Sequence, residues 1–201
     1  MIKESYNLVY GVGVKGMKYP AKKDKKHLIE YRVWASMLMR CYSKSLIIKK
    51  PCYDDCTVSD NFKSYTFFYE WCHEQAGFGN KDENGRVWQL DKDFLTKGNK
   101  VYSEHTSLFI PKEINTLLLS RQRDRSVTGI GNYYKDGRFI VQCSVMGRQT
   151  RVGCFKTQEE AFSAYKIFKE NRIKEVAEKW KGIVDDRVYQ TLINYEVNIN
   201  D

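Results

Sequence analysis

The sequence predicts an α+β protein, because two kinds of hydrophobic periodicity occupy separate parts of the chain. Between residues 28 and 75 apolar side chains recur with the spacing of amphipathic helices, whereas between residues 128 and 155 they alternate, as in strands joined by glycine turns. The region from residue 88 to residue 118 lies between them and predicts a strand, a loop, a second strand and a helix.

Composition limits the classes of partner. The chain has 201 residues, 42% of them hydrophobic, which is enough to bury the core of one ordinary domain or two small ones. With 34 Lys and Arg against 25 Asp and Glu, the net charge of +9 favours a polyanion, first of all nucleic acid, although a membrane surface would also suit it. No run of 18 apolar residues and no signal-like segment occurs. We therefore expect a soluble intracellular protein with reduced cysteines and no membrane partner.

The N-terminal segment combines a short apolar stretch with a basic one. Residues 1–14 include Leu8, Val9 and Tyr10 and predict a short strand or docking segment. Residues 15–26 then carry six lysines and form a basic arm, either a solvated, disordered connection or a segment that follows the phosphates of nucleic acid. In the second case the contacts to DNA are Lys22, Lys23, Lys25 and Lys26.

Two amphipathic helices follow. The spacing predicts one helix over residues 28–43 and another over residues 60–75, with Asp60 as the N-cap of the second. Aromatic residues at this spacing favour core packing over a platform that stacks bases. The predicted apolar stripes are Tyr31, Trp34, Leu38 and Cys41 in the first helix, and Phe62, Tyr65, Tyr69 and Cys72 in the second.

The cysteines of this region are candidate zinc ligands on composition alone. Cys52 and Cys56 are separated by three residues, which differs from the tight knuckle of a zinc ribbon, and Cys41 and Cys72 lie on apolar helix faces. Ordinary buried thiols are therefore favoured over structural zinc.

The central region places carboxylates at the end of a strand. After a turn over residues 77–86, Trp88 and Leu90 alternate with Gln89 and Asp91 as in a half-buried strand. A second apolar run, Leu108 to Ile110, precedes a helix that opens at Pro111. The apolar face of that helix consists of Ile114, Leu117 and Leu118.

A divalent cation fits this arrangement. Asp91 and Asp93 would form a small anionic pocket with Asn115 from the helix, and such a pocket suits Mg²⁺ or Mn²⁺ held against phosphate. Lys92 would then point away from the metal, toward phosphate or solvent. In the alternative interpretation Asp91 caps a turn around Gly98 and Asn99, and Asp93 pairs with a nearby lysine.

The last third of the chain predicts a small sheet and a helix. Residues 120–126 lack apolar periodicity and predict a linker, after which strands are expected at 128–134, 138–145 and 149–155. Asp136-Gly137 is a strong hairpin signal between the first two strands. Thr157 and Glu160 form a capping box for a helix with an apolar stripe that extends to Trp180, and a last helix follows around Val188.

The middle strand separates the two faces of this sheet. Phe139, Val141, Cys143 and Val145 share an apolar side that needs the helix, while the other side is polar. Arg and Gln on a narrow sheet can read guanine and adenine in the major groove of double-stranded DNA. A solvated polar face, or an RNA-binding module with Tyr133 and Tyr134 stacked on bases, are the alternatives. The candidate DNA contacts of this region are Arg138, Gln142, Gln149, Arg151, Tyr134, Lys135 and Arg148.

Several stretches resemble a family of bacteriophage proteins, the HNH or His-Me-finger endonucleases of the homing type. The similarity covers roughly residues 9 to 180. It rests on Leu90-Asp91-Lys92-Asp93, Gly98-Asn99-Lys100-Val101-Tyr102-Ser103 and Phe109-Ile110-Pro111-Lys112-Glu113-Ile114-Asn115, and upstream on Trp34-x-x-Met37-Leu38-x-Arg40-Cys41-Tyr42. Residues Gly129 to Ala161 are similar to the APETALA-type DNA-binding domain that such proteins often carry.

The resemblance implies a domain order. A ββα-metal, HNH-like domain with flanking helices would occupy residues 27–120, preceded by the N-terminal segment and basic arm at 1–26. A linker at 121–126 would lead to an APETALA-type domain at 127–180, a three-stranded antiparallel sheet packed on one helix. Residues 181–201 would form a C-terminal helix and tail.

The resemblance also implies chemistry. In an active nuclease Asp91 and Asn115 would hold a magnesium-like ion on the scissile phosphate, in the cytoplasm of an infected bacterium. The family usually has a histidine base directly after the metal-binding aspartate, where this chain has Lys92, and His105 is the histidine near enough in sequence to replace it. The competing expectation is a DNA-binding protein without chemistry that regulates or inhibits a host DNA-handling or defence system, with a host protein as a possible partner.

Overall fold

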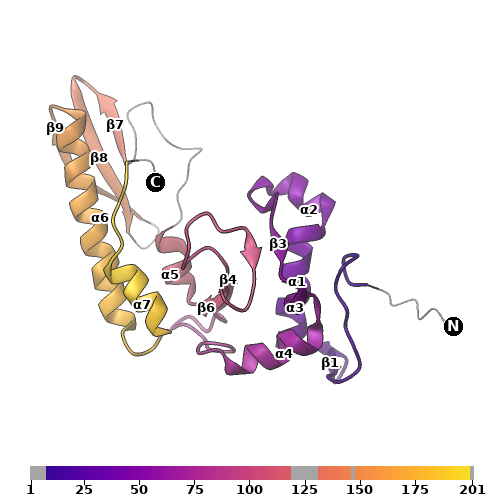
Figure 1. The fold of residues 1–201 in the computed structure, drawn as a ribbon. Coiled ribbons are helices and arrows are strands. Elements are labelled where there is room, and N and C mark those ends of the chain that lie inside the picture. Colours follow the sequence, from indigo (N-terminus) through magenta and orange to yellow (C-terminus); the bar gives the residue numbers. More distant parts are fainter. Residues whose placement is uncertain (1–7, 119–130, 146–147, 200–201) are drawn as a thin grey trace. The chain divides into compact units, whose positions relative to one another are not determined.

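The computed structural model describes residues 8–118, 131–145 and 148–199, and the chain divides into two compact units, residues 1–112 and 113–201. Helices and strands occur in both units (Figure 1), so the expected α+β class is confirmed. The expected linker at 121–126 lies outside the described residues.

The first unit begins with a hairpin and a group of helices. Strands β1 (Lys22–Lys23) and β2 (Lys26–His27) pair antiparallel, and α1 (Ile29–Tyr42) follows directly. The chain continues through α2 (Lys44–Lys49), the 3-10 turn η1 (Pro51–Tyr53), β3 (Thr57–Val58), α3 (Asp60–Lys63) and α4 (Tyr65–Glu74). Helices α1 and α4 pack against each other. The predicted helix over 28–43 is confirmed.

The second predicted helix, over 60–75, is divided at Ser64. The Ser64 hydroxyl accepts a hydrogen bond from the backbone N–H of Phe67 at 3.4 Å and caps α4. Ser59 caps α3 in the same way, through the N–H of Phe62, so the prediction that Asp60 is the cap was wrong. Serine has the same short acceptor as aspartate, and its position one residue earlier leaves Asp60 in the first helical turn.

The core of the first unit is aromatic, as the helical spacing predicted. Trp34, Phe62, Tyr65 and Phe68 are fully buried, and the indole N–H of Trp34 donates to the Phe62 carbonyl at 2.8 Å. The Tyr65 and Trp34 rings lie 5.3 Å apart between centroids. Base stacking by these side chains is therefore excluded.

The segment before the hairpin docks on these helices. Val14 donates to the Lys63 carbonyl and accepts from the N–H of Tyr65, which makes a parallel bridge to Ser64. A Cβ atom on Gly13 would lie 2.3 Å from a Leu38 methyl group, so only glycine allows this approach. The predicted docking segment is confirmed for the residues described.

The expected strand, loop, strand and helix occur in that chain order. Strand β4 (Gln89–Asp91) pairs antiparallel with β6 (Leu108–Ile110), with Leu90 opposite Phe109, and α5 (Lys112–Leu117) follows. Trp88 and Leu90 are buried while Gln89 is exposed, as the alternation predicted. Strand β5 (Val101–Tyr102) lies between β4 and β6 in the sequence but does not pair with either. It pairs with β3 in a parallel ladder.

The second unit contains α5 and the predicted sheet. Strands β7 (Asn132–Lys135), β8 (Arg138–Val145) and β9 (Arg148–Phe155) form an antiparallel sheet in that order, and α6 (Gln158–Trp180) packs on it, followed by α7 (Asp186–Ile193). Asp136 and Gly137 both have positive φ, 51° and 76°, as the predicted hairpin turn requires. The capping box of Thr157 and Glu160 is present. The three-stranded sheet on one helix is confirmed.

Contacts of Glu113 explain why α5 groups with the second unit. Its carboxylate accepts from the ammonium of Lys179 at 2.9 Å and from the indole N–H of Trp180 at 3.0 Å. Lys169 also donates to the Leu117 carbonyl at 2.6 Å. The boundary therefore falls eight residues earlier than the end of the first domain expected from sequence, residue 120.

Replacing Glu113 by alanine is expected to lower the free energy of unfolding at pH 7 by about 1–3 kcal/mol, because the bonds to Lys179 and Trp180 are removed. Burial alone would raise the pKa of Glu113, but these bonds hold the pKa below its ordinary value. A depressed carboxyl pKa contributes stability that is present above the unfolded pKa and is lost as pH falls through the folded one. Urea unfolding at several pH values measures this.

Glu113→Gln is the matched control, since its amide oxygen can still accept from the Trp180 indole while the charge opposite Lys179 is gone. We expect an intermediate loss of stability for this variant. A difference between wild type and Glu113→Ala that stays constant from pH 7 to pH 3 would contradict the role of the charge.

Candidate functional site

The register of the sheet in the second unit assigns each side chain to a face. Directly opposed residues of antiparallel strands share a face, and β8 pairs Val141 with Gly153 but Gln142 with Arg151. One residue of β9, Val152, is therefore an extra residue in a β-bulge. Beyond the bulge, Gln142 shares a face of the sheet with Arg151, and Ser144 shares that face with Gln149.

This placement separates a buried face from a polar one. Val141 is 0% and Cys143 is 3% exposed on the face covered by α6. The opposite face is largely open to solvent, and its charged and amide-bearing members are Lys135, Arg138, Gln142, Gln149 and Arg151, all exposed except the half-buried Gln142. The expectation that Gln149 and Arg151 join the polar side of β8 is confirmed by the register.

The two tyrosines of β7 lie on opposite faces of the sheet, and Tyr134, a candidate DNA contact, is not on the polar face. Tyr134 pairs with Phe139, on the α6 side of the sheet, where their ring centroids are 5.0 Å apart. Tyr133 pairs with Ile140 and therefore lies on the polar face. The alternation of side chains along β7 assigns each tyrosine to a face, but only once the pairing of β7 with β8 is known. The side chain of Arg148, a further candidate contact, lies outside the described part of the structure.

In the first unit, Asp91 ends β4 and caps the turn after it. One carboxylate oxygen accepts from the backbone N–H of Asp93 at 3.0 Å and of Phe94 at 2.8 Å. Burial, and then the carboxylate of Asp93, raise the pKa of Asp91 to about 6. The capping role resembles the alternative interpretation, but the capped turn is at residues 92–94 rather than at Gly98-Asn99. The Asn99 side chain instead donates to the carbonyls of Lys92 and Val101.

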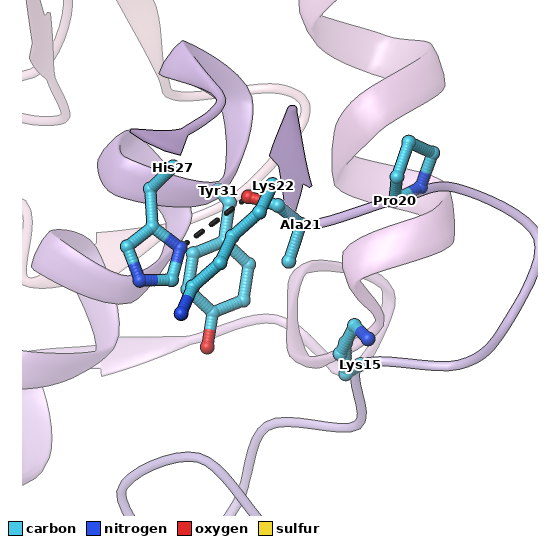
Figure 2. A pocket seen from close by; sticks show the side chains of 6 residues that line it. All are labelled: Lys15, Pro20, Ala21, Lys22, His27 and Tyr31. Atoms are coloured by element: carbon cyan, nitrogen blue, oxygen red, sulfur yellow. Dashed lines mark hydrogen bonds between the residues drawn. The ribbon is translucent and has the colours of Figure 1, made fainter. Parts of the chain in front are cut away.

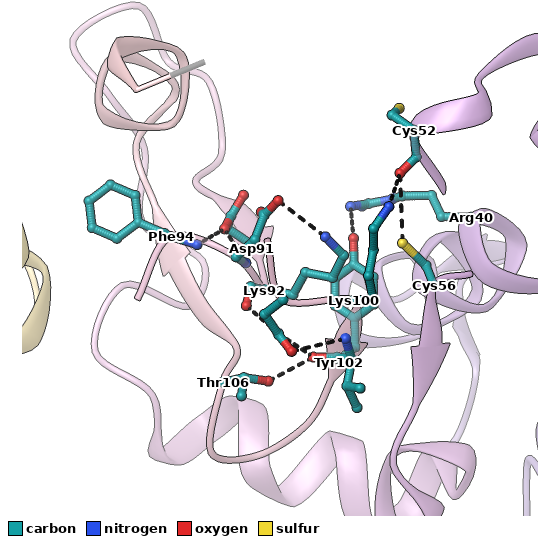
Figure 3. Close-up of polar contacts among 12 residues, drawn as sticks. Arg40, Cys52, Cys56, Asp91, Lys92, Phe94, Lys100, Tyr102 and Thr106 are labelled. Atoms are coloured by element: carbon teal, nitrogen blue, oxygen red, sulfur yellow. Dashed lines mark hydrogen bonds and ion pairs between the residues drawn. The ribbon is translucent and has the colours of Figure 1, made fainter. Parts of the chain in front are cut away.

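Lys92 does not point toward solvent, which corrects the expectation for this residue (Figure 3). Its side chain is 7% exposed, and its ammonium lies 3.3 Å from a carboxylate oxygen of Asp93 and 5.6 Å from the centre of the Tyr102 ring. The ring face and the carboxylate offset the cost of burying the charge.

The remaining candidates for metal chemistry are distributed over both units. His105 is exposed in the turn that joins β5 to β6, and Asn115 belongs to α5 in the second unit, whereas Asp91 and Asp93 belong to the first. Among the described residues no group of three or more His, Cys, Asp and Glu side chains could hold a metal. Two adjacent carboxylates are nevertheless present, and a coordination of the pair with Asn115 stays a prediction.

The cysteines lie where their helical positions predicted. Cys41 and Cys72 are buried on the inner faces of α1 and α4, and burial raises the pKa of the Cys41 thiol to about 12. Cys56 is also buried, whereas Cys52 is exposed. The thiols of the two helices are therefore protonated at neutral pH.

The basic arm is an ordered hairpin, which excludes the disordered connection for residues 15–26. Tyr19 stacks on Tyr69 with 3.9 Å between ring centroids, and the Tyr65 hydroxyl donates to the Pro20 carbonyl at 3.1 Å. The hairpin ends in a turn at Asp24 and Lys25, both with positive φ. An open pocket beside it (Figure 2) is lined by Lys15, Pro20, Ala21, Lys22, His27 and Tyr31.

The exposed lysines of this hairpin can be tested without removing the packed segment. Replacing all four by glutamine is expected to reduce the slope of log affinity for DNA against log salt by up to about 0.9 for each phosphate that the protein no longer neutralises. Filter binding or anisotropy at several salt concentrations measures the slope. The four residues are Lys22, Lys23, Lys25 and Lys26, all exposed.

The control neutralises four exposed lysines elsewhere in the first unit, which are Lys44, Lys49, Lys50 and Lys81. It removes the same net charge and should leave a steeper slope than the hairpin variant. Equal slopes in both variants would assign the hairpin lysines to solvent rather than to phosphate.

Comparison with known proteins gives no match to a family model, to a curated protein or to a solved structure. In the described ranges, no helix combines the length and the apolar character needed to cross a membrane. The sites themselves are therefore the basis for a proposed function.

Proposed function

We propose that this protein binds double-stranded DNA through the polar face of the sheet formed by β7, β8 and β9. The observation that carries the proposal is the register, because the β-bulge puts Arg151 beside Gln142 on the face turned away from α6. Arg138 and Gln149 lie on the same face and are exposed. Arginine and glutamine are the side chains that make bidentate contacts with guanine and adenine.

Shape and charge support the same partner. A narrow antiparallel sheet with a helix on its back can enter a major groove, which admits a two-stranded ribbon. The chain carries a net charge of +9, which favours association with a polyanion. The argument from shape uses residues of the second unit alone, whereas the net charge is that of the whole chain.

Single-stranded nucleic acid or RNA is the alternative within this class, since Tyr133 lies on the polar face and is 37% exposed. Competition for one labelled duplex by unlabelled duplex, single-stranded DNA and RNA tests the proposal. Duplex DNA is expected to compete best. If RNA or single-stranded DNA competes more strongly, that nucleic acid and not duplex DNA is the ligand of this face.

A second candidate function is metal-dependent cleavage of DNA, of the kind carried out by HNH endonucleases. The neighbouring carboxylates of Asp91 and Asp93 favour it, because Asp93 contributes to the raised pKa of Asp91 and a divalent cation bound by both would offset their repulsion. When bound, Mg²⁺ or Mn²⁺ would activate a water and neutralise charge on the scissile phosphate. Asn115 is the third ligand that the sequence predicts.

The buried Lys92 favours the other possibility, a DNA-binding protein without chemistry that regulates or inhibits a host DNA-handling or defence system. In place of a histidine base, this position holds an ammonium paired with Asp93. His105, exposed in its turn, is the base an active enzyme would need. Incubation of supercoiled plasmid with Mg²⁺ or Mn²⁺ distinguishes the two functions, since nicking is expected only from the enzyme.

A further inference from the structure

Two cationic side chains of the first unit lie against Tyr102, and a third, Lys100, lies with one of them, Lys92, near Cys56. Arg40 from α1 donates through Nη1 to the Tyr102 hydroxyl at 3.0 Å, and its guanidinium lies 5.8 Å from the centre of that ring. The ammonium of Lys92 is 5.6 Å from the same ring centre. Figure 3 shows Arg40 joined to the Tyr102 hydroxyl, and Lys100 directed toward the carbonyl of Cys52. We call these three side chains and Tyr102 the cation cluster.

Lys100 completes the cation cluster from the residue before β5. Its ammonium lies 3.3 Å from the carbonyl oxygens of Cys52 and Asp54, in and just after η1. The guanidinium of Arg40 lies 6.0 Å from the ring centre of Tyr53 in the same turn. Arg40 and Lys100 therefore both lie near η1, Arg40 beside the Tyr53 ring and Lys100 beside backbone carbonyls.

The cation cluster has an excess of positive charge. Within the described parts of the chain, Asp93 is the one carboxylate within ion-pair distance of any of its three cations, and it pairs with Lys92. Neighbouring thiols supply no counter-charge, because burial raises the pKa of Cys41 to about 12 and also raises that of Cys56. Burial likewise raises the pKa of Tyr102, so its hydroxyl is neutral. Like charges held together in this way favour an anion.

The donors of the cation cluster are suited to an oxyanion with several oxygens. A guanidinium has five N–H donors in a planar fork, and in the described structure Tyr102 is the residue to which Arg40 donates a hydrogen bond. Lys100 is exposed and adds an ammonium that contacts the carbonyls of η1 and Asp54 at 3.3 Å. Phosphate groups are bound by this combination of a fixed guanidinium and a point charge.

We propose that the cation cluster is a binding site for a phosphate group. Arg40 and Lys100 contact the phosphate oxygens, Tyr102 fixes the orientation of the guanidinium, and the buried Lys92 adds positive potential from beneath. The phosphate belongs either to a nucleic-acid backbone or to a free nucleotide. Only the first of these sources rests on the proposed DNA binding, because the site is built entirely from residues of the first unit.

Calorimetric titration of the full chain with inorganic phosphate, at ionic strength held constant with sodium chloride, tests the site directly. We expect saturable binding that is weakened about tenfold by Lys100→Gln and by Arg40→Gln, the change that follows from losing one charge-assisted hydrogen bond. Lys81→Gln, which removes an exposed charge from the loop before β4, should bind as wild type. Absence of saturation in the wild type, or an equal loss in Lys81→Gln, would overturn the proposal.

The role of Tyr102 has its own readout. Tyr102→Phe removes the hydroxyl that holds Arg40 and should weaken phosphate binding in the wild type but not in the Arg40→Gln background. An equal effect in both backgrounds would show that Tyr102 acts on the fold and not through Arg40.

Two further titrations identify the source of the phosphate. If Arg40→Gln and Lys100→Gln reduce the salt slope of duplex binding, the phosphate belongs to the DNA backbone. If the slope is unchanged while a deoxynucleoside monophosphate competes with inorganic phosphate, the site takes a free nucleotide. Both results support the phosphate site. If the protein binds phosphate but does not bind DNA, the proposed DNA binding is refuted and the phosphate site is not.

Discussion

Replacing Arg138 and Arg151 together by alanine is expected to weaken binding to a selected duplex by about 2–6 kcal/mol, if each guanidinium makes a bidentate contact with a base. Both side chains are exposed on the polar face of the sheet. The duplex is first obtained by selection from random sequences with the wild-type protein. Fluorescence anisotropy then compares the affinities, and the variant should also lose its preference at the contacted base pairs.

The thermal midpoint of this double variant should barely change, because neither side chain is part of the core. A control that replaces Lys174 and Lys181, both exposed in and just after α6, removes the same charge from outside the polar face. It should weaken binding much less and leave base preference intact. Unchanged DNA binding together with lost stability in the Arg138 and Arg151 variant would show that this face packs against protein.

Replacing Asp91 by asparagine is expected to abolish nicking that depends on Mg²⁺ or Mn²⁺ and to leave DNA affinity nearly unchanged. Asparagine keeps an oxygen that can accept from the N–H groups of Asp93 and Phe94, so the turn after β4 should persist. It removes the negative charge that a divalent cation needs. Calorimetry with Mg²⁺ beside a plasmid nicking assay measures both properties.

Asp91→Ala separates the structural role from the chemical one. It should lose nicking as Asp91→Asn does and should also lose about 0.5–2 kcal/mol of stability, since the cap itself is removed. Full activity in Asp91→Asn with instability in Asp91→Ala would make Asp91 a cap and not a ligand. A wild-type protein that neither binds Mg²⁺ nor nicks DNA would leave the DNA-binding protein without chemistry as the proposed function.

The fold was predictable wherever a local pattern decides the structure. Trp88 and Leu90 alternate with exposed neighbours, Thr157 and Glu160 cap their own helix, and Asp136-Gly137 closes a hairpin, all through contacts within a few residues. Ser64 shows the limit of this approach, because a helical stripe continues across it even though its hydroxyl begins a new helix.

The candidate site was less predictable because it depends on contacts between distant residues. The buried Lys92 lies beside the ring of Tyr102, which belongs to β5, a strand that pairs with the distant β3. Arg40 and Lys100 are 60 positions apart in the numbering, and nothing in either neighbourhood predicts that both border η1. The position of Tyr133 likewise depends on the pairing of β7 with β8.

The extra residue in β9 changes which face of the sheet the alternate residues of that strand occupy before and after it. Counted by simple alternation, Gln149, Arg151, Gly153 and Phe155 would all fall on one side, yet Gly153 and Phe155 share the side of Val141 while Arg151 and Gln149 share that of Gln142. A regular ladder in which Val152 paired with Gln142 would turn Arg151 and Gln149 toward α6. Deletion of Val152 would remove the bulge and still leave Arg151 opposite Gln142, so the β-bulge lets β9 carry one residue more than its partner without a change in the chemistry of the polar face.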